Sequence, residues 1–246
     1  MKKAKNILLL GANSDIAIAI GREFASKGSN IFLASRNIKN LEAESKHLEL
    51  LYKIKSKSFY FDASDLDSHN EFVETIDAEI DGIFLCFGNM PIQEDAQNDF
   101  SLIKECFEVN YLGAVNILEI FAKYFIKKKR GWIVGISSVA GDRGRGSNYI
   151  YGSSKAALSA YLQGLNHRLA KHNIHVMVVK PGFVDTKLTA ELNLPSYLTA
   201  STDEVAKRIY KALTKNKDEI YIRAVWRLIM LLIKSLPYWI FKKTKL

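Results

Sequence analysis

Apolar runs of strand length alternate with segments of helical length along most of this chain. The run KNILLLG at 5–11, for example, precedes DIAIAIGREFASKG, in which Ile16, Ile20 and Phe24 recur at helical spacing and Gly28 ends the pattern. Strands that are joined by helical crossovers lie parallel, and helices then cover both faces of the sheet. The seven apolar runs therefore predict an α/β fold, a single doubly wound domain with a seven-stranded parallel sheet. The runs occupy residues 5–11, 29–35, 56–62, 81–88, 131–138, 174–182 and 218–224.

Length, composition and charge indicate a folded globular protein. A chain of 246 residues that is 48% hydrophobic and holds only four prolines suits one large packed domain. The net charge of +9 could indicate a nucleic-acid partner, but residues 223–246 hold six cations and no acid, so the excess is local. We therefore expect a folded domain over 1–222, a basic amphipathic tail over 223–246, and no nucleic-acid partner.

The cysteines, the histidines and the N-terminus indicate a reducing compartment. Cys86 and Cys106 lie in apolar segments without disulfide or metal-ligand spacing, and only His172 and His175 form a close histidine pair. The N-terminal stretch ILLL is too short for a signal peptide and lacks a cleavage site. We expect no metal site and a cytoplasmic location.

The end of the first predicted strand reads LGANSDIA. In a doubly wound sheet, ligands bind at the carboxyl ends of the strands, where backbone N–H groups and a helix N-terminus can hold a pyrophosphate. Gly11, Asn13, Ser14, Asp15 and Ile16 are the candidates for that contact. The alternative is an ordinary strand-to-helix turn, in which Ser14 or Asp15 caps the helix.

The ends of the second and third predicted strands offer a nucleotide-binding set. Ser35 and Arg36 can supply a hydroxyl and a guanidinium to a ribose 2′-phosphate, which predicts NADP(H) in preference to NAD(H). Asp62 and Ala63 follow the third strand, where the Asp62 carboxylate could accept a hydrogen bond from an adenine amino group. Local turn formation by Asp62 explains that residue almost equally well.

Four polar residues in the middle of the chain are candidates for chemistry. Asn110 interrupts helical apolar repeats, which indicates either a functional residue or a cap on a kinked helix. Ser138 ends the fifth strand, on the ligand side of the sheet. Tyr151 and Lys155 lie four residues apart, on one face of a predicted helix. A cation beside a phenol favours the phenolate, although a surface pair without function has the same spacing.

Taken together and in this order, these motifs resemble the short-chain dehydrogenase/reductase family over about residues 5–222. The motifs are Asn110 in VNYLG, Ser138 in ISSVAG, Tyr151 and Lys155 in YGSSK, and PGFVDT at 181–186. The resemblance implies a Rossmann fold and hydride transfer between a nicotinamide and a carbonyl or secondary alcohol. It also implies that Tyr151 is the acid/base, with its pKa lowered by Lys155. Ser138 would hold the substrate oxygen, and Asn110 would steady a water that links Lys155 to solvent.

The resemblance also implies the residues that bind the cofactor, with two departures from the family pattern. The glycine-rich turn appears as LGANSDIA, which brings the charge of Asp15 near a pyrophosphate, and the usual NNAG appears as LCFG at 85–88. The PG turn would fix the nicotinamide carboxamide, and Lys155 would bind the nicotinamide ribose. The expected cofactor-binding residues are Gly11, Asn13, Ser14, Asp15, Ile16, Ser35, Arg36, Asp62, Ala63, Phe87, Gly88, Tyr151, Lys155, Pro181, Gly182, Val184 and Thr186.

The substrate is left open by the sequence. Residues 187–202 are short, mixed in polarity and suited to line a substrate pocket, but they name no substrate. The SDIA variant and the basic, aromatic tail resemble the envelope-sugar members of the family, which favours an NADPH-dependent ketoreductase acting on a sugar or a lipid-linked sugar. The alternatives are a soluble 3-oxoacyl or hydroxysteroid reductase and a non-catalytic dinucleotide sensor or scaffold.

The tail and two helical segments predict interaction surfaces. The longest uncharged apolar run of the tail, Leu228–Ile233, is too short to span a bilayer. Drawn as a helix, the tail carries Arg223, Arg227 and Lys234 on one stripe, which predicts a helix lying in an anionic lipid interface at the cytoplasmic leaflet. Packing at a subunit interface is the alternative. The family resemblance implies a homodimer or homotetramer that is formed through 101–128 and 151–171.

Overall fold

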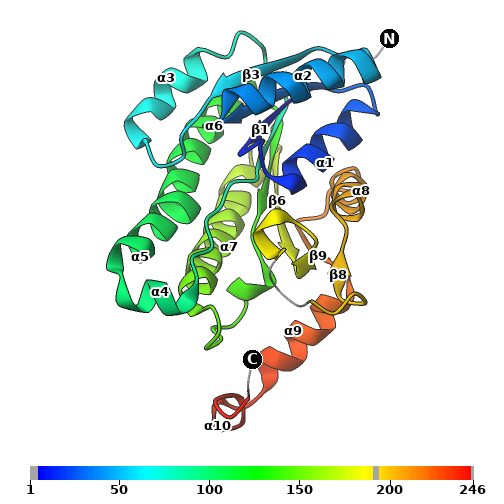
Figure 1. Cartoon of the computed structure of the whole chain (residues 1–246). Helices are drawn as coiled ribbons and strands as arrows, with labels where there is room; N and C mark the ends of the chain where they lie inside the picture. Colours follow the sequence, from blue (N-terminus) through cyan, green and yellow to red (C-terminus); the bar gives the residue numbers. More distant parts are fainter. Residues whose placement is uncertain (1–4, 191–193, 245–246) are drawn as a thin grey trace.

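The computed structural model describes residues 5–190 and 194–244, and its centre is a parallel sheet of seven strands. Each neighbouring pair of strands is parallel, so the predicted α/β fold and all seven predicted strands are confirmed (Figure 1). The strands in spatial order are β3 (Ser56–Tyr60), β2 (Asn30–Ser35), β1 (Asn6–Leu10), β4 (Gly82–Leu85), β5 (Gly131–Ile136), β6 (Ile174–Pro181) and β9 (Glu219–Ile222).

Helices pack on both faces of the sheet because the strands are apolar on both sides. In β1, Leu8 and Leu10 join the hydrophobic core on one face, whereas Ile7 and Leu9 join the core on the other. The first core is covered by α3 (His69–Glu74), α6 (Ala114–Lys128) and α7 (Tyr149–Ala170), and the second by α1 (Asp15–Ala25), α2 (Ile38–Tyr52) and α8 (Thr202–Leu213).

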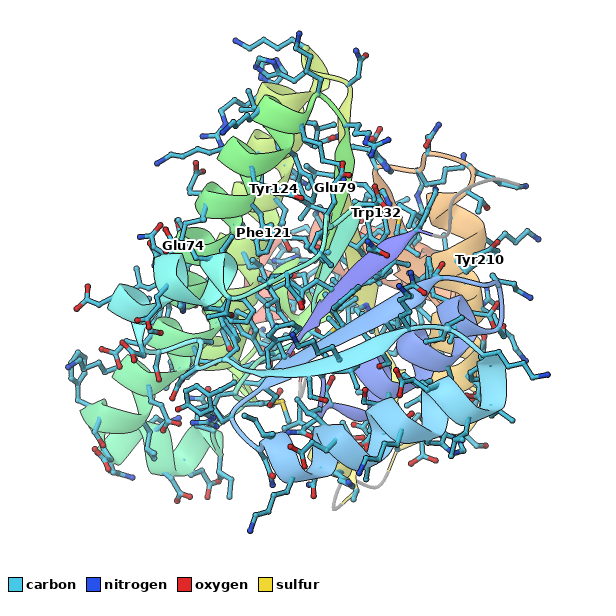
Figure 2. The ribbon with its side chains drawn as sticks, turned by 90° about the horizontal axis from the view of Figure 1, so that it is seen from above. Glu74, Glu79, Phe121, Tyr124, Trp132 and Tyr210 are labelled. Carbon is cyan, nitrogen blue, oxygen red and sulfur yellow. The ribbon has the colours of Figure 1, made fainter. Side chains whose placement is uncertain are left out.

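Figure 2 shows the two layers from above. Phe121 and Tyr124 of α6 lie on one side of the strands, and Tyr210 of α8 lies on the other. The remaining elements are short. They are η1 (Leu66–Ser68), α4 (Gln93–Asn98), α5 (Phe100–Phe107), the π-helix η2 (Glu108–Gly113), η3 (Val139–Gly141), β7 (Phe183–Val184), η4 (Lys187–Thr189), β8 (Thr199–Ala200), α9 (Val225–Ser235) and α10 (Tyr238–Phe241).

The strand order reverses between β1 and β4, because the chain runs outward from β1 to β3 and then returns to β4 on the opposite side of β1. Such a reversal leaves a crevice at the carboxyl ends of the strands. Gly11 lies there with a positive φ of 81°, and a Cβ on it would come within 2.5 Å of the Phe87 backbone nitrogen. Only glycine therefore fits where the loops after β1 and β4 meet.

The end of the chain packs partly on the domain, and α10 lies at its far end (Figure 1). Trp226 and Met230 of α9 are buried against Val139, and the Trp226 ring fills the space that a side chain at Gly182 would need. Arg143, in the loop after η3, donates hydrogen bonds to the carbonyls of Ile233, Lys234 (3.2 Å) and Leu236 (2.9 Å), and so caps the end of α9. No helix in the described ranges is both long and apolar enough to cross a bilayer.

One feature predicted for the tail is wrong. Arg223 lies before α9 and so does not share a helical stripe with Arg227 and Lys234. Its guanidinium instead donates to the Glu204 carboxylate (3.1 Å) and to the Tyr197 carbonyl (2.7 Å). Helical spacing does not report this ion pair with α8, because Glu204 lies far from Arg223 in the sequence.

Candidate active site

Three of the four predicted catalytic residues line one pocket at the carboxyl ends of β5 and β6. Tyr151 and Lys155 lie one turn apart on α7, and Ser138 follows β5, where its side chain accepts a hydrogen bond from the Ala140 backbone N–H (3.1 Å). The Ser138 side chain is close enough to Tyr151 to affect the pKa of its hydroxyl. The sheet end and the first turn of α7 therefore bring together residues that are separated in the sequence.

The electrostatics of Tyr151 differ from the expectation. Burial raises the pKa of Tyr151 to about 12, and the hydrogen bond with Ser138 offsets only part of that rise. The Lys155 ammonium lies 5.8 Å from the centre of the Tyr151 ring and donates to the Ile136 carbonyl (3.1 Å). Burial lowers the pKa of Lys155 to about 8. In the protein alone, Tyr151 thus stays a neutral phenol at physiological pH.

Asn110 lies in the π-helix η2, completely buried. Its Oδ1 accepts a hydrogen bond from the Asn89 backbone N–H (2.6 Å), and its Nδ2 donates to the Asn89 carbonyl (2.7 Å) and to Ser154 Oγ (2.8 Å). The side chain therefore joins the loop after β4 to α7. Single π-turns often mark functional sites, which agrees with the interruption seen in the sequence. The water relay predicted for Asn110 stays a prediction.

Gly88, also in the loop after β4, leaves room for these groups. A Cβ at Gly88 would lie 3.2 Å from Lys155 Nζ and 3.3 Å from Asn110 Oδ1. The neighbouring Phe87 packs on the core beside Phe61, with ring centres 5.8 Å apart. The departure from the family's usual NNAG thus replaces polar side chains with an aromatic contact.

At the start of α1, Ser14 and Asp15 bind different partners. Ser14 caps the helix by accepting a hydrogen bond from the Ala17 N–H (3.2 Å). The Asp15 carboxylate accepts from the Lys187 backbone N–H (2.8 Å) and lies 3.7 Å from the Lys187 ammonium. The charge that was expected beside a pyrophosphate is therefore offset by the segment that follows the PG turn. Ile16 lines the same pocket as Tyr151.

The residues after β2 and β3 form what we call the adenosine end of the crevice, namely Ser35, Arg36, Asp62 and Ala63. Ser35 Oγ accepts a hydrogen bond from Asn13 Nδ2 (3.0 Å), and Arg36 is exposed. Asp62 accepts from the Ser64 backbone N–H (2.9 Å), so the local turn does form. Burial raises the pKa of Asp62, but the hydrogen bonds from Ser64 and the charge of Arg36 lower it by more, and the carboxylate is ionised.

The PG turn closes the other end of the crevice. The Gly182 N–H donates to the Ile222 carbonyl (2.8 Å), and β7 pairs with β8 so that Val184 is buried opposite Ala200. Thr186 caps η4 together with Thr189. Pro181, Gly182, Val184 and Thr186 all line the pocket that holds Tyr151.

These residues fit an extended dinucleotide. Gly11 keeps the turn after β1 free of a side chain, α1 presents its N-terminus, and Gly88 leaves space beside Lys155. The two pockets share Asn13, Ser14 and Gly88 among their lining residues, so the adenosine end and the catalytic end are continuous.

Met90, Arg145 and Asn148 are among the residues that line the catalytic pocket and that sequence reasoning missed. Arg145 stands between two glycines in GDRGRGS, immediately before α7. A cation in such a loop, three residues from the first turn of a helix that carries a candidate acid/base, is a signal that could have drawn attention to it.

Comparison with known proteins agrees with this geometry. Residues 5–196 match the family described as short chain dehydrogenase. An uncharacterised oxidoreductase of Mycobacterium tuberculosis is 29% identical over 243 residues, which are 98% of this chain and 97% of that protein. A 3-oxoacyl-[acyl-carrier-protein] reductase of Aquifex aeolicus is 29% identical over 194 residues, 78% of each chain.

The fold is also that of solved structures. A short chain dehydrogenase of Burkholderia cenocepacia, solved in complex with NADP, superposes with a TM-score of 0.83 at 19% identity, over 95% of this chain and 94% of that one. The match of the family to most of the chain, the seven-stranded sheet and the crevice at its carboxyl edge lead to one assignment. The chain belongs to the short chain dehydrogenase family of NAD(P)-dependent oxidoreductases.

Proposed function

We propose that this protein reduces a ketone to a secondary alcohol with NADPH. The observation that carries the proposal is that Ser138, Tyr151 and Lys155 line one pocket, with the Ser138 side chain close enough to Tyr151 to lower the pKa of its hydroxyl in part. A carbonyl oxygen placed between the two hydroxyls could accept one hydrogen bond from each of them. When bound, the nicotinamide supplies the hydride to the carbonyl carbon.

In this proposal Tyr151 is the proton donor. Since its pKa is raised to about 12, the phenol carries its proton throughout the physiological range. The alkoxide that forms during reduction is a stronger base than a phenolate and takes that proton. A retained proton favours reduction, because the reverse reaction requires the phenolate.

In the proposed mechanism, Lys155 supplies a positive charge beside Tyr151. The Lys155 ammonium, with a pKa of about 8, is mostly charged at neutral pH and stabilises the phenolate left after proton transfer. We assign Lys155 also to the nicotinamide ribose. The buried Asn110 side chain bonds to Asn89 in the loop after β4 and to Ser154 in α7, and so holds this turn of the helix in place.

Arg36 supports the choice of NADPH. It is an exposed cation directly after β2, next to the Ser35 hydroxyl, and its charge lowers the pKa of Asp62 across the crevice. A 2′-phosphate could pair with the guanidinium bidentately, which a neutral ribose hydroxyl cannot do.

For the substrate we propose a sugar or lipid-linked sugar that is met at the cytoplasmic leaflet. Leu228, Leu231 and Leu232 are 59%, 63% and 59% exposed, on the side of α9 opposite to Trp226 and Met230. Beyond them, Tyr238 and Trp239 are exposed as well, and the tail contains cations but no acid. Exposed apolar and aromatic groups bordered by cations suit an anionic lipid surface. A second copy with the same basic face would be repelled.

A soluble 3-oxoacyl reductase is the second candidate. The relative from Aquifex aeolicus that carries that name favours it. A soluble reductase of this kind does not explain why the leucines of α9 are exposed.

We further propose a homodimer or homotetramer through 101–128 and 151–171. The large apolar side chains of α6 and α7 are mostly buried in the domain's own core, and Glu119 and Arg168 pair across the two helices (2.8 Å). Polar contacts would therefore contribute much of such an interface. Light scattering at micromolar concentration should give at least twice the chain mass, and a monomer mass would contradict the proposal.

The decisive experiment is a substrate screen that follows the oxidation of NADPH through its absorbance. The panel contains keto-sugars, detergent-solubilised lipid-linked keto-sugars, 3-oxoacyl thioesters and 3-ketosteroids. Turnover that is highest on the lipid-linked sugars supports the proposal, and turnover that is highest on the thioesters supports the second candidate. Absence of turnover on every carbonyl, with NADPH binding intact, would contradict a reductase.

A further inference from the structure

Arg145 enters the catalytic pocket from the loop between η3 and α7 and has no partner there. Its Nε is buried and makes no hydrogen bond within the described residues, and burial lowers the pKa of the guanidinium with no acid to offset it. It lines the same pocket as Ser138 and Tyr151. Arg145 is half-buried as a residue, but an enclosed guanidinium nitrogen without a hydrogen-bond acceptor is costly, and a ligand that offers an acceptor would satisfy it.

The other cations that line this pocket are engaged with the protein. Lys155 donates to the Ile136 carbonyl (3.1 Å), and Lys187 lies 3.7 Å from the Asp15 carboxylate. Arg143, two residues before Arg145, stacks on the Phe241 ring at 3.8 Å and caps α9. The lack of a partner is therefore specific to Arg145 and is not a general property of this loop.

Asn148 provides a second unsatisfied group in the same place. Its Oδ1 is buried without a hydrogen-bond partner in the part of the chain that the structure describes, and the residue lines the pocket. The Asn148 carbonyl accepts from the Gly152 N–H (2.8 Å), which fixes the residue at the start of α7, one turn before Tyr151. A donor and an acceptor thus stand unpaired in the pocket of the candidate acid/base.

Apolar side chains form much of the remaining wall. Met90, Val139, Phe183 and Leu188 line the pocket around the polar groups. Water in such a wall finds few partners, whereas a ligand with one anionic group and an apolar or ring-like body would match both parts.

We propose that Arg145 binds an anionic group, a phosphate or a carboxylate, on the carbonyl substrate, and that Asn148 accepts a hydrogen bond from a neighbouring substrate hydroxyl. The proposal rests on the proposed function, since it concerns the substrate of the same pocket. A guanidinium can pair bidentately with either anion, which fixes the orientation of the substrate as well as its charge.

The test compares charged and uncharged ketones. The probes are dihydroxyacetone phosphate, the carboxylate acetoacetate and the uncharged dihydroxyacetone, each titrated calorimetrically at low salt into the wild type loaded with NADP⁺, which cannot reduce them. We expect one of the two anions to bind at least tenfold more tightly than dihydroxyacetone, and the one that does so identifies the anion. Equal binding of all three probes would overturn the proposal.

Variants locate the effect. Arg145→Gln should weaken binding of the preferred anion at least tenfold and leave dihydroxyacetone unchanged, whereas Arg145→Lys should restore part of the loss. Lys207→Gln, which removes an exposed cation of α8, is the matched control and should change neither. If Arg145→Gln and Lys207→Gln behave alike, the anion does not bind at Arg145.

The binding readout separates this inference from the proposed function. A wild type that reduces ketones but binds all three probes alike keeps the reductase assignment and refutes the anion site. A wild type that prefers the anion through Arg145 but reduces no carbonyl keeps the site and refutes the reductase.

Discussion

At the catalytic end of the crevice Asn110 and Lys155 are buried and bonded to backbone groups, whereas at the adenosine end Arg36 is exposed. A buried polar group must be satisfied by fixed partners, so the catalytic end is determined by the packing of η2 and α7. The adenosine end carries its charges on loops, where a substitution disturbs little of the fold. Under the proposed function, the residues of the reaction are thus held by the core of the protein, whereas the residue that selects the cofactor lies on an exposed loop.

Tyr151→Phe should give the largest effect. The substitution removes only the hydroxyl, so turnover should fall by about 10²–10⁴-fold, the usual contribution of a general acid. Cofactor affinity and melting temperature should stay close to those of the wild type, because the aromatic ring at position 151 is retained. Steady-state rates on a verified substrate and NADPH fluorescence titration measure the two quantities. Wild-type turnover in this variant would refute the acid/base assignment.

Asn110→Ala tests the rigidity of the catalytic end. It removes the Asn110 partner from the partly buried N–H and carbonyl of Asn89, at a cost of up to about 1–3 kcal/mol for each group left unsatisfied. Urea unfolding should show this loss of stability together with a fall in turnover. Asn40→Ala, at an exposed position of α2, is the control and should change the free energy of unfolding by much less. Equal losses in the two variants would show that the hydrogen bonds of Asn110 do not contribute to the stability of the fold.

Arg36→Asp tests the adenosine end. It should weaken NADPH binding by about 10- to 100-fold for each of the one or two charge-assisted hydrogen bonds that are lost. NADH, which has no 2′-phosphate, should lose much less, and the free energy of unfolding should stay the same. Fluorescence titration with both cofactors measures the difference. A loss of the same size for both cofactors would remove Arg36 from the 2′-phosphate site.

The pH dependence follows from Lys155. Since burial lowers its pKa to about 8, the ammonium is present below that pH and lost above it, while Tyr151 keeps its proton up to about 12. For reduction, kcat/KM should therefore be level below pH 8 and then fall about tenfold per pH unit. Initial rates between pH 6 and 10 measure the profile. A level profile up to pH 10 would mean that the charge on Lys155 is not required.

The parts of this molecule that sequence predicted are those with local causes. Strand ends and helical spacing bring Ser138, Tyr151 and Lys155 together once the sheet is known, and the interruption at Asn110 coincides with the π-helix. The charge balance of Asp15 could not be predicted, because its partner lies 172 residues further along the chain.

The same limit applies to the loop before α7 and to the tail. Whether Arg143 caps α9 and Arg145 remains unpaired depends on where the C-terminal segment packs, which no local pattern reports. Arg223 was placed on a helix by its spacing, but its ion pair with Glu204 lies outside any helix. Long-range pairing of charges was thus the part that sequence could not provide.

The smallest effect on turnover is expected at α9. Removing the whole tail would also remove Trp226, whose ring packs on Gly182 at the catalytic pocket. A truncation would therefore change the stability of the fold as well as membrane binding, and the two effects could not be separated. Replacing Leu228, Leu231 and Leu232 with Gln changes only exposed groups. Turnover on a water-soluble ketone should then remain at the wild-type value.

Membrane binding should change instead, because the three leucines are the apolar part of the proposed lipid contact. The wild type should co-sediment with phosphatidylglycerol vesicles at low salt and detach as salt screens its cations, and the triple variant should stay in solution. Leu50→Gln with Leu51→Gln, on exposed positions of α2, is the control and should bind as the wild type does. Equal binding of the triple variant and the control, or no binding by the wild type, would mean that the exposed face of α9 does not bind lipid. The catalytic end would in that case meet its substrate in solution.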